Sequence, residues 1–231
     1  YSGMASTFTI FEFSDKLSLK LHIDGLSRVF GTMVSILWIP TVIYAFEYMT
    51  HEGNEDRFFS FFTMTFGVVL GIAYSANFLT MYLFYEFLTL VTLPLVMHAM
   101  DNKARHAGKM YILYMMFGAS LAFIGFVFVY CYGTTIDFLP GGVLNPILVA
   151  GNESTLHLVY LVTFFGFGVK AAVFPLYRWL PKASVAPTPV TALLHAVAVV
   201  KSGVFAIVRM TYYSFGTSFL TGTWVQNVIL V

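Results

Sequence analysis

Long apolar runs alternate with short polar stretches along most of the chain. A bilayer core of ~30 Å needs ~20 apolar residues per helix, so each such run predicts a membrane-spanning helix. The predicted helices lie near residues 28–48, 58–76, 78–98, 110–132, 156–174 and 189–210. A seventh apolar run begins near residue 218 and is too short to span before Val231. The pattern therefore predicts an all-α, polytopic membrane helix bundle with about six to seven transmembrane helices.

The first 25 residues follow a different pattern. Apolar and polar side chains alternate there in the stretch TFTIFEFSDKLSLKLHID, as they do in a half-buried β-strand. We therefore expect residues 1–25 to be an extramembrane segment with a short β-hairpin, and residues 26–231 to be the transmembrane domain. The chain begins without Met and stops inside an apolar run, so we expect a fragment truncated at its C-terminus.

Composition supports a membrane protein and narrows its chemistry. The chain is 58% hydrophobic and only 10% charged, whereas soluble domains carry about 25% charged residues. A single cysteine, Cys131, excludes a disulfide framework within the chain and a cysteine-rich cluster site. The sequence shows no nucleophile elbow, phosphate loop or zinc-protease motif, and nothing in it indicates nucleic-acid binding. We therefore expect no cofactor in this chain.

The basic residues of the connecting segments predict an orientation. The face that follows the first predicted helix carries Arg57, Lys103, Arg105 and Lys109. It also gains Arg178 and Lys182 if the predicted helix near 156–174 crosses the membrane. The opposite face carries Lys16, Lys20, Arg28 and Arg209. Since cytoplasmic loops are enriched in Lys and Arg, the segment 100–109 is predicted to lie in the cytoplasm.

Glu86 is an acidic residue inside a predicted span. It lies nine residues after Asn77, so it sits ~13 Å along the helix, near the middle of the bilayer. A carboxylate at that depth costs several kcal/mol unless it is paired, hydrated or protonated, and intramembrane acids are functional by default. The alternative is a protonated Glu86 that hydrogen-bonds Tyr82 or Tyr85.

Lys170 precedes a predicted break in a helix. Pro175 lies five residues later, and it removes a backbone donor and clashes with the carbonyl of Ala171. Lys170 would then sit at the C-terminal end of a half-helix, where the carbonyls favour a cation. The prolines predicted to break the helix are Pro175, Pro181, Pro187 and Pro189. Broken helices at membrane depth line watery cavities or are buried in protein, although Lys170 could instead extend to the interface.

His195 and Lys201 share the last predicted helix. In a regular α-helix they project about 120° apart, with ~9 Å between them along the axis. This spacing favours successive stations of a path rather than a pair of ligands; a buried structural histidine is the alternative for His195. Glu86, Lys170, His195 and Lys201 together predict a proton relay, because burial and nearby charges move the protonation equilibria of such groups.

At these residues the sequence resembles a known family. The segments that carry the resemblance are NFLTMYLFYEF and KAAVFPLYRWLPKASVAPTPVTALLHAVAVVKSGVFAIVR. They resemble the antiporter-like subunits of respiratory complex I, the large subunits of Mrp-type sodium/proton antiporters and the corresponding subunits of membrane-bound hydrogenases. The resemblance covers roughly residues 60–210. One departure is Lys182, which stands where the family usually has Asp or Asn after the Trp-Leu-Pro motif.

The resemblance implies the first half of an inverted-repeat fold, with a broken helix in each repeat. It implies that Glu86 and Lys170 form an ion-pair couple, and that His195 and Lys201 lead toward the second half-channel. It also implies other membrane subunits as partners, protons or sodium ions as cargo, and a bacterial or archaeal cell membrane rather than the mitochondrial inner membrane.

Two other classes remain open from the sequence. A membrane redox enzyme of the cytochrome b type would need two histidines on facing helices as haem ligands. His98 and His106 fall at a helix end and in a loop, which leaves only His195 deep in a span. A structural membrane subunit without a transport role would tolerate Glu86→Gln and Lys170→Ala.

Overall fold

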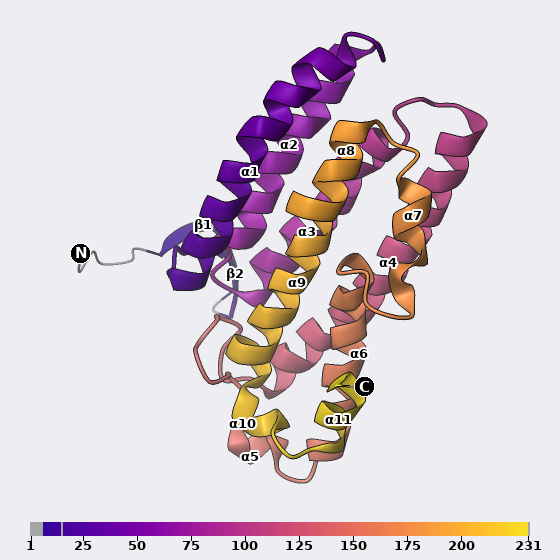
Figure 1. Cartoon of the computed structure of the whole chain (residues 1–231). Helices are drawn as coiled ribbons and strands as arrows, with labels where there is room; N and C mark the ends of the chain where they lie inside the picture. The colour runs from indigo at the N-terminus through magenta and orange to yellow at the C-terminus, as the bar shows by residue number, and fades with distance from the viewer. Residues whose placement is uncertain (1–6, 15, 231) are drawn as a thin grey trace.

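A computed structural model describes residues 7–14 and 16–230 of the chain. Six long rods form the bundle (Figure 1). Five of them are the helices α1 (Gly25–Met49), α2 (Glu55–Ala73), α3 (Phe78–Val96), α4 (Asn102–Tyr132) and α6 (Glu153–Lys170). The sixth is a continuous rod that runs through α8 (Thr188–Ala192), a π-helical turn (Leu193–Val197), α9 (Val199–Arg209) and a second π-helical turn (Met210–Phe215).

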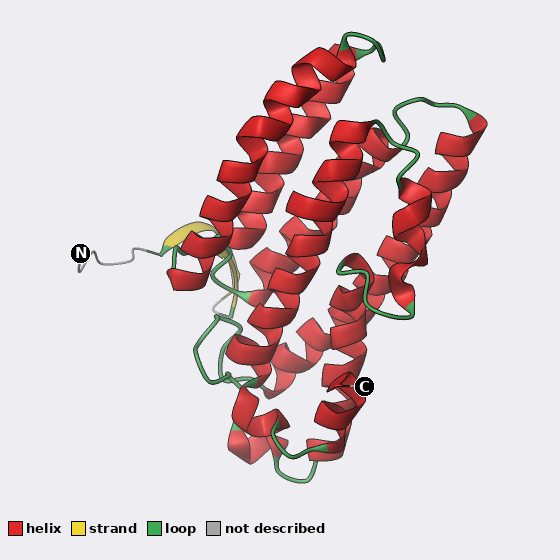
Figure 2. Cartoon of the chain, viewed as in Figure 1, coloured by secondary structure: helices red, strands yellow, loops and turns green. Residues whose placement is uncertain are grey.

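Short elements connect these rods or follow the last one, as the colouring by secondary structure shows (Figure 2). They are α5 (Pro146–Val149), a 3₁₀ turn (Leu176–Arg178), α7 (Trp179–Ala183), α10 (Thr217–Leu220) and α11 (Trp224–Leu230). The last predicted apolar run, near residue 218, is therefore divided between α10 and α11 rather than forming one helix. A glycine with a positive φ of 76°, Gly222, lies between the two and interrupts the run.

The prediction of a helical membrane bundle is confirmed. Within the described residues, α1, α2, α3, α4 and the rod Thr188–Phe215 are long and apolar enough to cross a bilayer. Their outward faces present large apolar side chains, for example Ile36, Ile43 and Leu113. Such a surface is suited to contact with lipid and would be costly in water.

Polar side chains fix where several helices begin. Asp24 accepts a hydrogen bond from the Ser27 backbone at 2.8 Å and caps α1, and Asn77 caps α3 in the same way through Thr80. Asp101 caps α4. These side chains satisfy backbone donors that the first helical turn leaves free. They therefore place the turns between the helices at the ends of the bundle.

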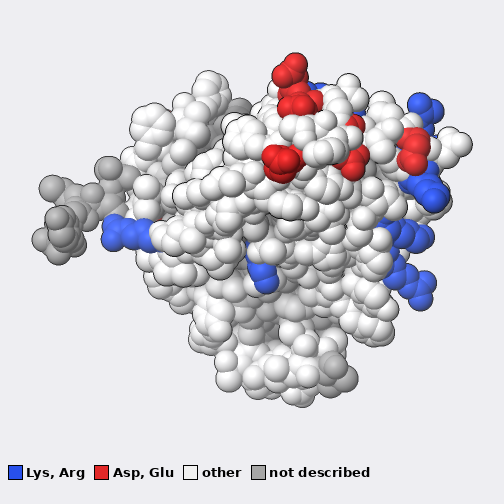
Figure 3. Space-filling model, turned by 45° about the horizontal axis from the view of Figure 1, so that its top comes forward, with Lys and Arg blue, Asp and Glu red and all other residues white. Residues whose placement is uncertain are grey.

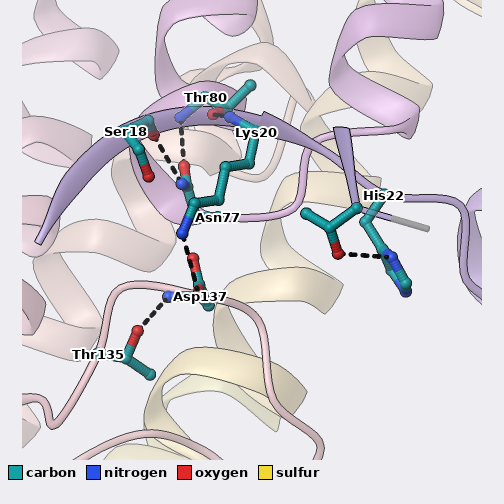
Figure 4. A network of polar contacts seen from close by, with 8 residues as sticks. Ser18, Lys20, His22, Asn77, Thr80, Thr135 and Asp137 are labelled. Atoms are coloured by element: carbon teal, nitrogen blue, oxygen red, sulfur yellow. Dashed lines mark hydrogen bonds and ion pairs between the residues drawn. The ribbon is translucent and has the colours of Figure 1, made fainter. Parts of the chain in front are cut away.

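A hairpin of β1 (Phe8–Ser14) and β2 (Leu17–Leu21) covers the end of the bundle where α3 begins. Figure 4 shows the polar contacts that attach it. The Asn77 amide donates to the Ser18 carbonyl at 2.7 Å, and the Lys20 backbone donates to the Thr80 hydroxyl at 3.0 Å. Lys20 also lies 3.8 Å from the Asp137 carboxylate. The hairpin is thus joined to α3 and to the loop before α5.

Glycines let α4 and α6 pack closely around the site. A Cβ added at Gly118 of α4 would meet the Gly166 carbonyl of α6 at 2.7 Å, which is shorter than any normal contact. A Cβ added at Gly203 of α9 would meet the backbone nitrogen of Ala171, just past the end of α6, at a distance even shorter than that at Gly118. Backbones approach at this distance only where one partner lacks a side chain. The end of α6 is therefore held tightly between α4 and α9.

Charged side chains gather at one end of the bundle, where α1 joins α2 and α3 joins α4 (Figure 3). The exposed acids at this end include Glu52, Glu55 and Asp56, and the exposed bases include Lys103 and Arg105. Much of the remaining visible surface is uncharged. Lys103 and Arg105 are among the basic residues that predict the cytoplasmic face, and that orientation stays a prediction.

Candidate functional site

The site lies where the chain between α6 and α8 leaves the helical conformation. α6 ends at Lys170, Ala172 has a left-handed φ of 56°, and helical turns resume at Leu176. Pro175 has no backbone N–H and cannot extend α6. The Trp179 indole is fully buried and donates to the Val169 carbonyl at 2.7 Å, so α7 satisfies one of the free carbonyls at the end of α6.

Lys170 is 0% exposed, and its ammonium group points into α3. Its Nζ donates to the Tyr85 carbonyl at 2.5 Å and to the Thr89 hydroxyl at 2.9 Å. The same atom lies 3.6 Å from the centre of the Tyr85 ring. We call these three acceptors, the Tyr85 carbonyl, the Tyr85 ring and the Thr89 hydroxyl, the lysine seat. Two hydrogen bonds and a cation–π contact thus replace the water that a free ammonium would bind.

Glu86 follows Tyr85 on α3 and is half-buried. Its Oε1 atom is buried, and among the described residues it meets no hydrogen-bond donor. In that same part of the chain the ion pairs join Arg209 to Asp24 and Lys20 to Asp137, so Lys170 and Glu86 form none in this arrangement. The structure therefore brings the two residues into one region, with the lysine held by neutral acceptors and the buried Glu86 Oε1 atom without a donor among the described residues.

His195 lies in the π-helical turn Leu193–Val197 and is half-buried. One ring nitrogen, Nε2, lies 3.1 Å from the Ser184 hydroxyl, just after α7. A π-helical turn rotates less per residue than an α-helix, so the angle of about 120° to Lys201, calculated for a regular helix, does not apply. His195 is thus connected to the residue that follows α7, and not to Lys170.

Lys201 occupies an exposed position on α9. It lines an apolar groove of about 180 Å³ with Phe30 and Met33 of α1 and Val204 of α9. Lys170 and Gly203 lie toward the interior, so Lys201 faces the outside of the described bundle. The sequence predicted a buried position for this residue, and the structure of this chain does not provide one.

The four prolines take different places in the segment after α6. Pro175 precedes the 3₁₀ turn Leu176–Arg178, and Pro181 lies inside α7. Pro187 is the N-cap of α8, and Pro189 occupies its first turn. Proline is compatible with the first turn of a helix, where the missing N–H has no partner to lose. Pro187 and Pro189 therefore mark where the last rod begins.

Sequence reasoning missed the residues that hold Lys170. Thr89 and Tyr85 are 81 and 85 positions away from it in the chain. The one available signal for these residues was helical spacing. Thr89 lies four positions after Tyr85 and three after Glu86, so the three residues lie about one turn of α3 apart. Within the described residues, no group of three His, Cys, Asp or Glu side chains is arranged to hold a metal ion.

These observations define the class of this protein: it is a polytopic membrane protein with ionisable side chains in its core beside an interrupted helix. A family model described as NADH:quinone oxidoreductase/Mrp antiporter, TM, matches residues 75–231. A second, described as NADH-Ubiquinone oxidoreductase (complex I), chain 5 N-terminus, matches residues 11–59. The chain belongs to the NADH:quinone oxidoreductase/Mrp antiporter family, and the resemblance seen in the sequence is confirmed.

Individual relatives agree with this assignment. The antiporter subunit mnhA2 of Staphylococcus epidermidis is 31% identical over an alignment of 201 residues that covers 84% of this chain. The corresponding protein of Staphylococcus aureus strain MSSA476 is 30% identical over the same length. The match covers 24% of each relative, so the chain spans about a quarter of their length.

Two solved membrane complexes share the fold. A chain of the archaeal membrane-bound sulfane sulfur reductase has a TM-score of 0.75 and 20% identity, over 92% of this chain and 43% of that one. A chain of the Mrp complex from Dietzia sp. DQ12-45-1b has a TM-score of 0.75 and 22% identity, over 88% and 22%. The described bundle is therefore a fragment of the antiporter fold, and its structural neighbours come from multi-subunit membrane complexes.

Proposed function

We propose that this chain supplies a proton path in a cation/proton antiporter-type membrane subunit, with Lys170 as its central group. The observation that carries the proposal is a lysine with 0% exposure at the end of an interrupted helix, held by neutral acceptors beside a carboxylate whose buried Oε1 atom meets no donor among the described residues. Burying an ammonium group in this way is costly and contributes little to stability. Its presence is best explained by a need to bind and release a proton.

Glu86 is the partner that we assign to Lys170. An ammonium near the carboxylate favours the charged pair, and a lysine withdrawn from it favours a neutral acid. A change in the distance between the two groups therefore loads or releases a proton. His195 and Lys201 continue the path in this proposal, from the break toward the exposed face of α9, which further helices of a full-length subunit would cover.

The assembly and the ion remain part of the proposal. The family contains complex I-type, Mrp-type and hydrogenase-type subunits, and we favour an Mrp-type or related complex in a bacterial or archaeal membrane, because the matched relatives come from such organisms. The proposed partners are other membrane subunits and the lipid bilayer, and the cargo is protons, exchanged for sodium in the Mrp-type alternative. The chain itself is proposed to hold no cofactor.

The test uses the full-length subunit in its assembled complex, in everted membrane vesicles that carry a pH gradient. Collapse of the gradient after addition of Na⁺ or K⁺ is followed with a pH-sensitive dye. Lys170→Ala and Glu86→Gln should each reduce transport by about tenfold or more, as expected when a charge-assisted interaction is removed.

Matched controls are Lys182→Ala and Glu55→Gln, which change exposed residues of the same type. Both should retain the wild-type rate. Normal transport by a correctly assembled Lys170→Ala complex would overturn the proposal. A response to Na⁺ but not to K⁺ would assign the coupling ion.

A further inference from the structure

Thr89 belongs to the lysine seat and has no role in the relay described above. It is 3% exposed, and its hydroxyl accepts a hydrogen bond from Lys170 Nζ at 2.9 Å. The other main acceptor is the carbonyl of Tyr85, four residues earlier on α3. In an α-helix that carbonyl is the one within reach of a threonine hydroxyl at position 89.

Other threonines of this bundle show what such a hydroxyl does when nothing intervenes. Thr65, Thr92 and Thr163 each donate to the carbonyl four residues earlier, at 2.6–2.7 Å. At Thr89 the corresponding carbonyl accepts from Lys170 instead. Lys170 therefore occupies the place that the hydroxyl hydrogen of Thr89 would otherwise take.

This geometry allows two arrangements in which the Tyr85 carbonyl has a hydrogen-bond donor. With the ammonium present, the Tyr85 carbonyl and the Thr89 oxygen both accept hydrogen bonds from it. With the ammonium withdrawn, the Thr89 hydroxyl can rotate and donate to the Tyr85 carbonyl, because a hydroxyl is both donor and acceptor. Withdrawing the Lys170 ammonium would be costly if it left a buried polar group without a hydrogen-bond partner. The rotated Thr89 hydroxyl avoids this cost, because it pairs with the Tyr85 carbonyl.

When Lys170 leaves the lysine seat, the carboxylate of Glu86 can accept a hydrogen bond from its ammonium group. Glu86 lies three residues before Thr89, so the two side chains project from neighbouring positions on one face of α3, ~4.5 Å apart along the axis. Its buried Oε1 atom has no donor among the described residues. Beside Glu86 the ammonium donates a hydrogen bond to the carboxylate and the two form a charged pair, which is the state that close approach of the two groups favours.

We propose that Thr89 is a positioning residue that takes the place of Lys170 at the Tyr85 carbonyl and thereby allows the lysine to move between its seat and Glu86. This inference rests on the proposed function, because it assumes that Lys170 carries the transported proton. It assigns a role to the hydroxyl group itself, and not to the volume of the side chain.

The experiment compares Thr89→Val, which keeps the shape and loses the hydroxyl, with Thr89→Ser, which keeps the hydroxyl. Transport is measured from pH 6 to pH 9 in the vesicle assay, with Lys170→Ala in parallel. Thr89→Val should lower transport about tenfold, the effect of one lost hydrogen bond to a charged group. As the pH rises, the transport activity of Thr89→Val should also begin to decline at a lower pH than that of wild type. The reason is that the ammonium has lost an acceptor and gives up its proton more readily. Thr89→Ser should restore both the rate and the pH profile.

Thr92→Val is the matched control, since Thr92 lies three residues further along α3 and its hydroxyl contacts the Leu88 and Thr89 carbonyls and the Tyr111 hydroxyl, but neither Lys170 nor the Thr89 hydroxyl. It should leave the pH profile unchanged. Where Thr89→Val fails to assemble, Thr89→Ala, which adds no volume, carries the same expectation. The inference is wrong when the hydroxyl-free variant transports like wild type, or when Thr89→Ser is as impaired as Thr89→Val. Wild-type transport by Lys170→Ala would instead remove the proposed function.

Discussion

Two buried cations in this bundle are held in opposite ways. Arg209, which is 1% exposed, donates through both terminal nitrogens to the Asp24 carboxylate, at 2.5 and 2.8 Å, and to the Ser27 hydroxyl at 2.8 Å. Lys170, which is 0% exposed, is held by a carbonyl, a hydroxyl and an aromatic ring. Among the described residues, one cation is paired with a full negative charge, and the other is not.

The difference separates a structural contact from a mobile one. The Arg209 guanidinium matches the carboxylate in a planar, two-bonded geometry, and arginine does not release its proton in proteins. The contact joins the start of α1 to the end of α9, so it fixes the two helices relative to each other. The Lys170 ammonium can lose a proton, and the nearby Glu86 carboxylate has an oxygen without a donor among the described residues. We infer that the first site holds the bundle together and that the second carries the chemistry.

The largest expected effect comes from replacing Lys170 with arginine, the residue that forms the structural contact at position 209. Lys170→Arg keeps the positive charge and prevents deprotonation, so transport should fall by about tenfold or more if a proton must leave this position. The measurement is gradient collapse in everted vesicles that contain the assembled complex. Substantial transport by this variant would mean that residue 170 acts through its charge alone.

The reciprocal substitution, Arg209→Lys, is the control for that comparison. It keeps a charge beside Asp24 but loses the two-bonded geometry. It should lower the thermal stability of the purified complex while leaving the pH profile of transport as it is in wild type.

An intermediate effect is expected from Asp24→Asn. This change leaves the Arg209 charge buried without its carboxylate, which typically destabilises a protein by about 3–5 kcal/mol. Thermal unfolding of the detergent-solubilised complex measures the loss. Lys170→Met, which removes a buried charge without an ion-pair partner among the described residues, should cost less stability than Asp24→Asn. The reverse order would contradict the division into a structural and a mobile site.

The smallest effect is a dependence of stability on acid pH. Partial burial raises the pKa of Asp24, but the hydrogen bonds from Arg209 and Ser27 outweigh it and hold the pKa at about 2, below its ordinary value of 3.8. Because the folded-state pKa is lowered, the stabilisation is complete above pH 3.8 and is lost as the pH falls toward 2. Unfolding midpoints measured across this range should fall more steeply for wild type than for Asp24→Asn.

The sequence by itself determined the class of fold and the principal candidates for the site. Lipid excludes free charge, so Glu86 and Lys170 were conspicuous inside apolar runs without any knowledge of their neighbours. Pro175 indicated where a helix could not continue, and α6 ends before it, because proline lacks the donor that the helix needs. These are local properties of a residue and its immediate context, and periodicity reports them well.

Only the tertiary structure decided which groups meet. Arg209 and Asp24 are separated by 185 positions, and Lys170 and Thr89 by 81, so no local pattern connects either pair. Packing also decided that Lys201 faces outward and that Lys170 binds neutral acceptors in place of Glu86. The physical reason is that helical periodicity fixes the direction of a side chain relative to its own axis, while the rotation and depth of each helix depend on close contacts such as that of Gly203 with Ala171.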